Sequence, residues 1–259
     1  MEQSTAKQEP SLLRRDATPD SAAAIPGALL PAARQYELAP PRRDRERILP
    51  PGAGGPHAAP YRMLRSQVTT RLDKLDANTL AMLSPLSAAG KTLTAINLAI
   101  AIAAERDRTA ILVDFDLRNP SVHQRFGFEP KLGVEDCLTS SRPVHEAIVR
   151  IAGYERLLLL PARNRVENSS ELLAESRTHD LIEELRRLGA KPVLIFDLPP
   201  VLQADDALLF SRHVQCGLMV VRENSTRREE LTRAIELLHD LPLLGTVLNA
   251  SREPRTTAY

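Results

Sequence analysis

The sequence predicts a doubly wound α/β fold with a mainly parallel sheet and helices on both of its faces. Short apolar runs that suit buried strands recur along the chain, amphipathic helical stretches separate them, and a phosphate-loop-like segment joins the first run to the longest apolar helix. Continuous apolar strands that alternate with helices are what a parallel sheet covered on both faces requires. The carboxyl ends of such strands meet along one edge, where we expect the ligand site.

The expected elements follow one another in a regular order. Tyr61, Leu64, Val68, Leu72 and Leu75 recur every three or four residues and predict a helix before the first strand. Strands are expected at the apolar runs 80–83, 110–114, 157–160, 193–196, 218–221 and 245–248. Further helices are expected at 91–105, 144–151, 170–188, 206–211 and 226–239, with an internal break of 170–188 left open.

The composition argues against several classes of protein. The chain has 259 residues with 34 Lys and Arg against 33 Asp and Glu, and a net charge of +1 disfavours bulk electrostatic binding of nucleic acid. Cys137 and Cys216 are its two cysteines, which disfavours a disulfide framework or a zinc site and fits a reducing cytosol. The apolar run 98–104 is far shorter than the roughly 20 residues of a membrane span. We therefore expect a cytoplasmic protein without a direct membrane span.

The distribution of proline predicts the domain organisation. Ten of the 20 prolines precede residue 61, and each removes a backbone donor and disfavours helix at the residue before it. Residues 1–55 are therefore predicted to form a disordered tail rich in Pro, Ala and Arg. One folded domain is expected over 56–251, followed by a flexible C-terminal tail, 252–259, that contains Tyr259.

The segment 84–92 (SPLSAAGKT) is similar to a Walker A phosphate loop. It lies between a strand and a helix and ends in Gly-Lys-Thr. In such a loop backbone N–H groups surround the phosphates, the lysine neutralises their charge and the hydroxyl binds Mg²⁺. The partial positive charge of the helix N-terminus adds to this attraction. The residues expected to bind nucleotide here are Ala88, Ala89, Gly90, Lys91, Thr92 and Leu93.

The predicted loop is poor in glycine. Pro85 occupies a position where a standard loop has glycine, and Ala88 and Ala89 precede Gly90. An alanine held at positive φ costs about 1 kcal/mol or more. The sequence therefore predicts either weak nucleotide binding or a changed path of the loop.

Two further apolar runs end in carboxylates. Asp114 ends the run 110–114, and Asp116 follows two residues later, so both side chains point to the same side of the strand. Two negative charges so close together need a cation or a proton between them. Asp197 ends the run 192–197 in the manner of a Walker B strand, and Pro199 and Pro200 stiffen the exit. A Mg²⁺–nucleotide complex would supply the cation that these carboxylates need.

The three segments together resemble the bacterial tyrosine kinases, or BY-kinases. These are cytoplasmic P-loop autokinases of exopolysaccharide and capsule synthesis and export loci. The matching segments are 84–97, 111–127 (ILVDFDLRNPSVHQRFG) and 194–207 (LIFDLPPVLQADDA), and the resemblance spans roughly 61–251. It implies a P-loop NTPase fold of the MinD/ParA-like type, with ATP and Mg²⁺ as cofactors.

The resemblance also implies roles for single residues. Lys91, Asp114 and Asp116 would be catalytic, and Thr92, Asp114 and Asp197 would hold the metal. Asn249, in the segment 244–249, is similar to an asparagine that contacts the adenine base, and Tyr259 would be the phosphoacceptor. Arg118 has an expected role in charge compensation. The partitioning ATPases of the same fold carry an additional early lysine where this chain has Leu86, which favours the kinase branch.

Two departures from the family pattern accompany the glycine-poor loop. The family usually ends in a cluster of tyrosines, whereas Tyr259 is the single tyrosine in the last ten residues. The assembly motif Glu-x-x-Arg-x-x-Arg has Ala59 in place of the glutamate, while Arg62 and Arg65 match.

The sequence therefore leaves two candidate functions open. The first is an ATP- and Mg²⁺-dependent protein-tyrosine autokinase that regulates exopolysaccharide synthesis or export. The second is a non-kinase ATP-binding switch or scaffold, with weak ATPase activity, that controls a membrane polysaccharide co-polymerase. In either case we expect a homo-oligomer without nucleic acid. A membrane chain-length determinant protein is the expected activator, and it would bring the chain to the inner face of the cell membrane.

Overall fold

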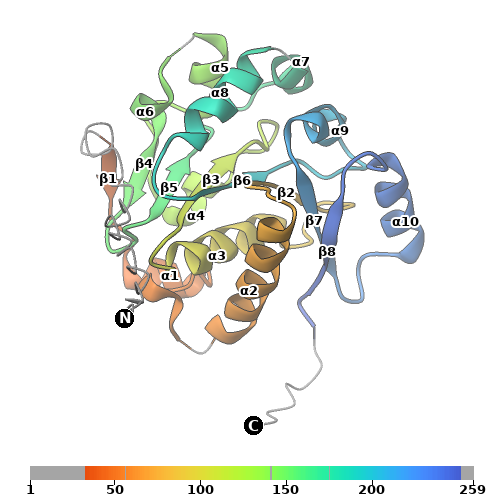
Figure 1. Ribbon diagram of the computed structural model, residues 1–259, viewed down its shortest axis with the longest axis horizontal. Coiled ribbons are helices and arrows are strands. Elements are labelled where there is room, and N and C mark those ends of the chain that lie inside the picture. The colour runs from red at the N-terminus through yellow and green to blue at the C-terminus, as the bar shows by residue number, and fades with distance from the viewer. Residues whose placement is uncertain (1–32, 56, 141, 175, 252–259) are drawn as a thin grey trace, which may run out of the picture.

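The fold is an eight-stranded sheet with helices on both faces (Figure 1). The computed structural model describes residues 33–55, 57–140, 142–174 and 176–251. The strand order is β1-β4-β5-β3-β6-β2-β7-β8, and the pairs are parallel except for the antiparallel pair of β4 and β5. The strands are β1 (Arg34–Tyr36), β2 (Thr79–Leu83), β3 (Thr109–Asp114), β4 (Val149–Ile151), β5 (Leu157–Leu160), β6 (Pro192–Asp197), β7 (Cys216–Arg222) and β8 (Leu243–Asn249). The predicted fold class is confirmed.

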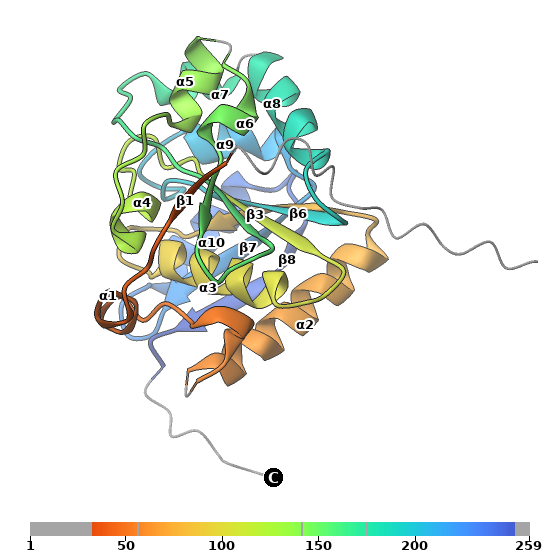
Figure 2. The same ribbon diagram turned by 90° about the vertical axis from the view of Figure 1, so that its left-hand side faces the viewer.

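Two layers of helices cover the sheet, as the view in Figure 2 also shows. One face is covered by α1 (Pro40–Arg45), α2 (Ala58–Lys74), α3 (Lys91–Ala103) and α4 (Val122–Phe126). The other face carries α5 (Val134–Thr139), α6 (Val144–Ala147), α7 (Ser169–Ala174), α8 (Ser176–Arg186), α9 (Asp206–Phe210) and α10 (Arg228–Leu237). Short 3₁₀ turns lie at Pro51–Ala53 and Ser211–His213. No described helix is both long enough and apolar enough to cross a membrane.

The central strands β2, β3, β5 and β6 are buried almost throughout because each of them faces two cores. Successive side chains of a strand point to opposite faces of the sheet. In β3, Ala110 and Leu112 pack with α2, α3 and α4, whereas Ile111 and Val113 pack with α5, α8 and α9. This double burial explains why the strands appear in the sequence as continuous apolar runs.

The folded domain begins before residue 56, which corrects the predicted boundary at its N-terminal end. β1 pairs in parallel with β4, and Ile48 and Leu49 are buried in the core next to α3. Asn97 of α3 fixes this segment, because its side chain accepts a hydrogen bond from Leu49 N and donates one to Arg47 O. The prolines do not prevent this segment from folding, because α1 begins with Pro40 and Pro41, at positions of a helix that need no N–H donor. Residues 1–32 and 252–259 lie outside the described residues.

One predicted helix is wrong in part and another is divided. The stretch 144–151 contains the short helix α6 and then β4, because the chain becomes extended at Ile148 and the β-branched pair Val149 and Ile151 enters the sheet. The stretch 170–188 is divided into α7 and α8, the internal break that the sequence left open. The six predicted strands are confirmed, each to within two residues at either end.

Candidate functional site

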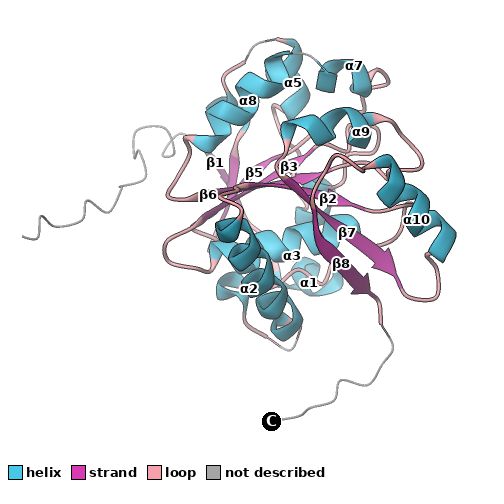
Figure 3. Cartoon of the chain, turned by 45° about the vertical axis from the view of Figure 1, so that its right-hand side comes forward, coloured by secondary structure: helices cyan, strands magenta, loops and turns pink. Residues whose placement is uncertain are grey.

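The phosphate-loop segment lies between β2 and α3, at the carboxyl edge of the sheet (Figure 3). Gly90 has φ +88° and is the residue just before α3, whose first residues are Lys91 and Thr92. Ala88 has φ +60°. The structure therefore confirms that an alanine of this loop occupies the left-handed region, at a cost of about 1 kcal/mol relative to glycine.

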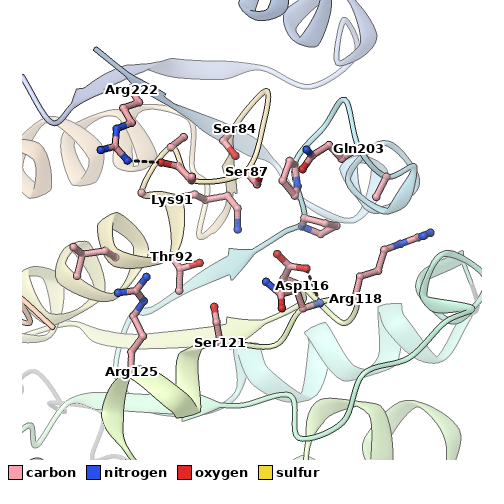
Figure 4. A pocket seen from close by; sticks show the side chains of 18 of the residues that line it. Ser84, Ser87, Lys91, Thr92, Asp116, Arg118, Ser121, Arg125, Gln203 and Arg222 are labelled. Carbon is pink, nitrogen blue, oxygen red and sulfur yellow. Dashed lines mark hydrogen bonds between the residues drawn. The ribbon is translucent and has the colours of Figure 1, made fainter. Parts of the chain in front are cut away.

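A cavity of about 650 Å³ opens above the loop (Figure 4). Its walls come from the phosphate loop, from the segment after β3, and from the Pro-Pro turn after β6. The predicted residues Ala88, Ala89, Gly90, Lys91, Thr92, Leu93 and Asp116 line it. The structure thus places the phosphate loop and the segment after β3 around the same cavity.

Lys91 and Thr92 both contact Asp197 beneath this cavity. Lys91 Nζ lies 2.5 Å from Asp197 Oδ1, and Thr92 Oγ1 donates a hydrogen bond of 2.6 Å to Asp197 Oδ2. Asp197 is fully buried and the Lys91 side chain is nearly so. The Walker A-like and Walker B-like segments are therefore in direct contact, as their combination in the sequence predicted.

Asp114 lies opposite Asp197 on the neighbouring strand. Its carboxylate is fully buried and accepts hydrogen bonds of 3.0 Å from Ser121 N and Val122 N at the start of α4. Burial, followed by the negative charge of Asp197, raises the pKa of Asp114 to about 8. At neutral pH a pKa of about 8 favours the protonated form of this carboxyl group.

Asp116 lies at the wall of the cavity. Burial raises its pKa to about 6, while the Lys91 ammonium opposes that rise. Asp116 Oδ1 also accepts a hydrogen bond from Asn119 N, which fixes the turn after β3. An acidic group with a pKa near neutrality can accept or release a proton under physiological conditions.

These residues fit a nucleotide phosphate with Mg²⁺. Positive charge and free N–H groups at the start of α3 suit an anion, and the hydroxyl and carboxylates suit a hard cation. Within the described residues no group of three His, Cys, Asp or Glu side chains is arranged to hold a metal ion. Mg²⁺ usually completes its coordination shell with water and substrate phosphates and needs few protein ligands. Thr92 with one or two aspartates is therefore a sufficient set of protein ligands.

Arg118 makes a structural contact as well as lining the cavity. Arg118 Nε donates to Asp206 Oδ2 at 2.9 Å, and Nη2 donates to Asp205 Oδ1 at 3.1 Å. Asp206 is fully buried and also accepts from Ser169 Oγ. The arginine expected to compensate charge in the site thus joins the segment after β3 to α9.

Asn249 lies beside the loop, with both ends of its side-chain amide occupied. Its Nδ2 donates to Ala89 O at 2.8 Å, and its Oδ1 accepts from Ala250 N at 2.8 Å. The predicted contact with an adenine base stays a prediction. Tyr259 lies outside the described residues, so its role as phosphoacceptor stays a prediction as well.

Sequence reasoning missed several residues that line the cavity. They are Ser87, Ser121, Arg125, Arg165, Gln203 and Arg222. Arg222 ends the apolar run of β7, and a charged residue at the carboxyl end of a buried strand was a usable signal. The others lie on loops and on the short helix α4, whose approach to the cavity depends on tertiary packing.

The sequence is similar to those of bacterial tyrosine kinases. No family model matches the chain. Tyrosine-protein kinase YwqD of Bacillus subtilis is 27% identical over 201 residues, which cover 77% of this chain and 83% of that protein. The putative tyrosine-protein kinase EpsB of Ralstonia nicotianae is 30% identical over 210 residues, which cover 79% of this chain and 27% of that protein. The chain therefore matches most of one relative and about a quarter of the other.

Solved structures give the same result. The chimerical protein CapA2B2 superposes with a TM-score of 0.72 at 26% identity and covers 86% of this chain and 96% of that one. The kinase domain of the Escherichia coli tyrosine kinase ETK superposes with a TM-score of 0.69 at 25% identity, over 77% of each chain. Cobyrinic acid a,c-diamide synthase of Mycobacterium smegmatis, solved with an ATP analogue and magnesium, shares the fold at 22% identity over 68% of this chain and 77% of that one, with a TM-score of 0.53. In sequence and in fold the chain is therefore similar to bacterial tyrosine kinases, the family that its motifs resemble.

Proposed function

We propose that the chain is an ATP- and Mg²⁺-dependent protein-tyrosine autokinase that regulates exopolysaccharide synthesis or export. One observation carries the proposal. Lys91 and Thr92, at the start of α3, meet Asp197 under a cavity whose wall holds Asp116, in a chain related to tyrosine kinases. This arrangement combines the phosphate-binding, metal-binding and proton-accepting groups that phosphoryl transfer requires.

Each residue has a role that its position supports. The N–H groups from Ala88 to Leu93 and the Lys91 ammonium bind phosphate oxygens, and Thr92 Oγ1 and Asp197 hold the metal with Asp114. Bound Mg²⁺-ATP supplies the transferable phosphoryl group and part of the charge neutralisation. Asp116, with a pKa of about 6 and a place at the cavity wall, accepts the proton that the tyrosine hydroxyl loses.

The first experiment tests for transfer to the chain itself. Purified protein with Mg²⁺-ATP is analysed by intact mass and by anti-phosphotyrosine detection, beside Lys91→Ala and Lys131→Ala. Lys131 is an exposed lysine away from the cavity and serves as the matched control. We expect phosphate increments in the wild type and in Lys131→Ala and none in Lys91→Ala. Increments that persist in Lys91→Ala would contradict the proposal.

Tyr259 is the proposed phosphoacceptor, from one subunit to the site of its neighbour. Its support is its position as the single tyrosine in the last ten residues. Of the other tyrosines, Tyr154 is buried and donates a hydrogen bond to Leu49 O, which makes it a poor acceptor. Tyr259→Phe is expected to remove most of the phosphotyrosine. Full phosphorylation of that variant would rule out Tyr259 while leaving the kinase assignment intact.

A non-kinase switch or scaffold is the second candidate, because Ala88 has a strained φ of +60° in the phosphate loop. This candidate binds ATP weakly, hydrolyses it slowly and controls a membrane polysaccharide co-polymerase. Measurable ATP binding without any phosphotyrosine, even with the candidate membrane activator added, would favour it over the kinase.

We also propose a homo-oligomer that is activated by a membrane chain-length determinant protein. The proposal rests on the relationship to the bacterial tyrosine kinases. Mixing the purified chain with the cytoplasmic segment of the candidate activator is expected to raise phosphotyrosine formation. An unchanged rate across a saturating titration would oppose activation by that protein, and light scattering gives the size of the oligomer.

A further inference from the structure

The phosphate loop of this chain has a conformational cost that a glycine-rich loop lacks. Ala88 lies at φ +60°, in the left-handed region where a residue with a Cβ atom is disfavoured relative to glycine. A phosphate-binding loop must also direct its N–H groups toward the ligand and its carbonyl groups away from it. Something else in the protein therefore has to stabilise this conformation.

Two side chains contact successive carbonyl groups of the loop. Arg222 Nη1 donates a hydrogen bond of 3.0 Å to Ala88 O, which Figure 4 shows as a dashed line. Asn249 Nδ2 donates one of 2.8 Å to Ala89 O. The two residues end the neighbouring strands β7 and β8, where they are register partners. They form a pair of donors, at the ends of two neighbouring strands, that bind two successive carbonyl groups of the loop.

Both donors are themselves held in place. Arg222 N donates to Thr226 Oγ1 at 3.0 Å, and Asn249 O accepts from Glu223 N at 3.0 Å. The amide of Asn249 is oriented further by the hydrogen bond from Ala250 N to its Oδ1. The carboxyl ends of β7 and β8 thus present two fixed hydrogen-bond donors to the loop.

Gly90 allows the approach of Asn249. A Cβ at Gly90 would lie only 2.0 Å from Asn249 Nδ2 and 3.2 Å from its Cγ. The loop therefore retains glycine at the one position where a side chain would displace Asn249, and it has alanine at the positions whose carbonyls the two donors bind.

We infer that Arg222 and Asn249 are positioning residues that hold the glycine-poor loop in its nucleotide-binding conformation. The inference rests on the proposed binding of nucleotide at this loop. A hydrogen bond from a charged donor offsets the cost of the Ala88 conformation, so the binding-competent loop is the populated one. When the competent fraction falls, the apparent dissociation constant rises in proportion, although no phosphate ligand has been lost.

The test is a double-mutant cycle between Arg222→Ala and Ala88→Gly. Dissociation constants are measured by titration with a fluorescent ADP analogue and Mg²⁺. We expect Arg222→Ala to weaken binding about tenfold and to weaken it by less than about threefold in the Ala88→Gly background, since glycine adopts positive φ without cost. Equal losses in both backgrounds would mean that Arg222 contacts the nucleotide directly, and no loss in either would mean that it does not support the loop. Either result overturns the inference.

A second readout does not depend on nucleotide. Amide hydrogen exchange of residues 87–91 in nucleotide-free protein is expected to be faster in Arg222→Ala and in Asn249→Asp, which lacks the amide donor. Arg222→Lys keeps a charged donor and is expected to recover part of the protection. Arg233→Ala, an exposed arginine of α10, is the matched control and should leave these amides unchanged. Unchanged exchange in all the variants would refute the inference, whereas failure of the wild type to bind nucleotide would refute the proposed function alone.

Discussion

Lys91 Nζ lies 2.5 Å from Asp197 Oδ1, so the lysine that we propose to bind phosphate is already paired with a carboxylate. Asp197 is fully buried, and its second oxygen accepts from Thr92. A nucleotide phosphate would therefore compete with Asp197 for Lys91. Loss of the lysine would leave a buried carboxylate without a cation, at a cost of several kcal/mol. If Asp197 held a Mg²⁺ ion, that ion would supply the cation that Asp197 loses when Lys91 binds phosphate.

The first prediction concerns Asp197→Asn. Removal of the carboxylate frees Lys91 for phosphate, so the affinity for nucleotide in the presence of EDTA should rise about tenfold, or ~1.4 kcal/mol. The increase in affinity that Mg²⁺ produces should be lost. Titrations with nucleotide in the presence and absence of Mg²⁺ measure both the affinity in EDTA and the increase that Mg²⁺ produces. Asp205→Asn, an exposed carboxylate paired with Arg118, is the control and should retain the Mg²⁺ effect. Weaker binding in EDTA would contradict competition by Asp197.

The second prediction concerns pH and Asp114. Its pKa is raised to about 8 in the folded protein from 3.8, and that of Asp116 is raised to about 6. The folded state then binds more protons than the unfolded state, so stability is greatest at low pH and falls as pH rises through 6 and 8. Asp114→Asn removes most of this loss. Its melting temperature relative to the wild type should therefore increase from pH 5 to pH 8.5.

The control for this pH experiment is Asp107→Asn. A hydrogen bond from Lys191 lowers the pKa of the exposed Asp107, so its contribution to stability is lost only at acidic pH. The difference in melting temperature between this variant and the wild type should stay constant from pH 5 to pH 8.5. A constant difference for Asp114→Asn as well would show that Asp114 is already ionised in the nucleotide-free protein at pH 5.

The sequence predicts the centre of this fold better than its edges. β3 and β6 are buried on both faces, so apolar runs identify them and locate Asp114 and Asp197 at their ends. β1 and β4 have only three residues each. β1 pairs with β4, and β4 pairs in turn with β5. A three-residue strand carries too short a pattern for its period to be recognised.

Within the site, too, the sequence predicts local features but not contacts between distant residues. Lys91 and Thr92 are predictable, because the loop, the helix start and the residue types occur together in one local segment. The contact of Arg222 with Ala88 joins residues 134 positions apart, and nothing near either residue in the sequence indicates it. The left-handed φ of Ala88 was expected from the loop pattern, whereas the donors that stabilise it become visible only in three dimensions.

The third prediction concerns Arg118 and the buried Asp206. Arg118→Ala removes a cationic donor from a fully buried carboxylate, a change that costs 3–5 kcal/mol in fully buried pairs. The Arg118 side chain is 37% exposed, so water screens the pair and we expect a loss of about 1–2 kcal/mol. The free energy of unfolding in urea measures it. Adding Asp206→Asn should recover part of the loss.

The control for Arg118 is another arginine that pairs with a carboxylate. Arg142 bonds Glu146 at 3.0 Å one helical turn away, and both side chains are exposed. Arg142→Ala is expected to change the free energy of unfolding by less than about 0.5 kcal/mol. Equal effects of the two substitutions would mean that Asp206 is stabilised sufficiently by Ser169 and its surroundings.

The fourth prediction concerns the segment before residue 56. Ile48 and Leu49 are 4% and 2% exposed, and each buried side chain of this size contributes about 1.5–3 kcal/mol. The hydrogen bonds from Leu49 N to Asn97 and from Tyr154 to Leu49 O join this segment to α3 and to the turn after β4. A chain that begins at residue 56 should therefore be at least about 3 kcal/mol less stable than one that begins at residue 33.

A matched pair of leucines tests this prediction without shortening the chain. Leu49→Ala should cost about 2–4 kcal/mol, because a cavity forms in the core next to α3. Leu75→Ala removes the same atoms from a side chain that is 53% exposed and should cost less than about 1 kcal/mol. Because Asn97 lies on the helix that begins with Lys91, Leu49→Ala is also expected to weaken nucleotide binding. Equal and small losses of stability in both variants would restore the boundary at residue 56 that the prolines suggested.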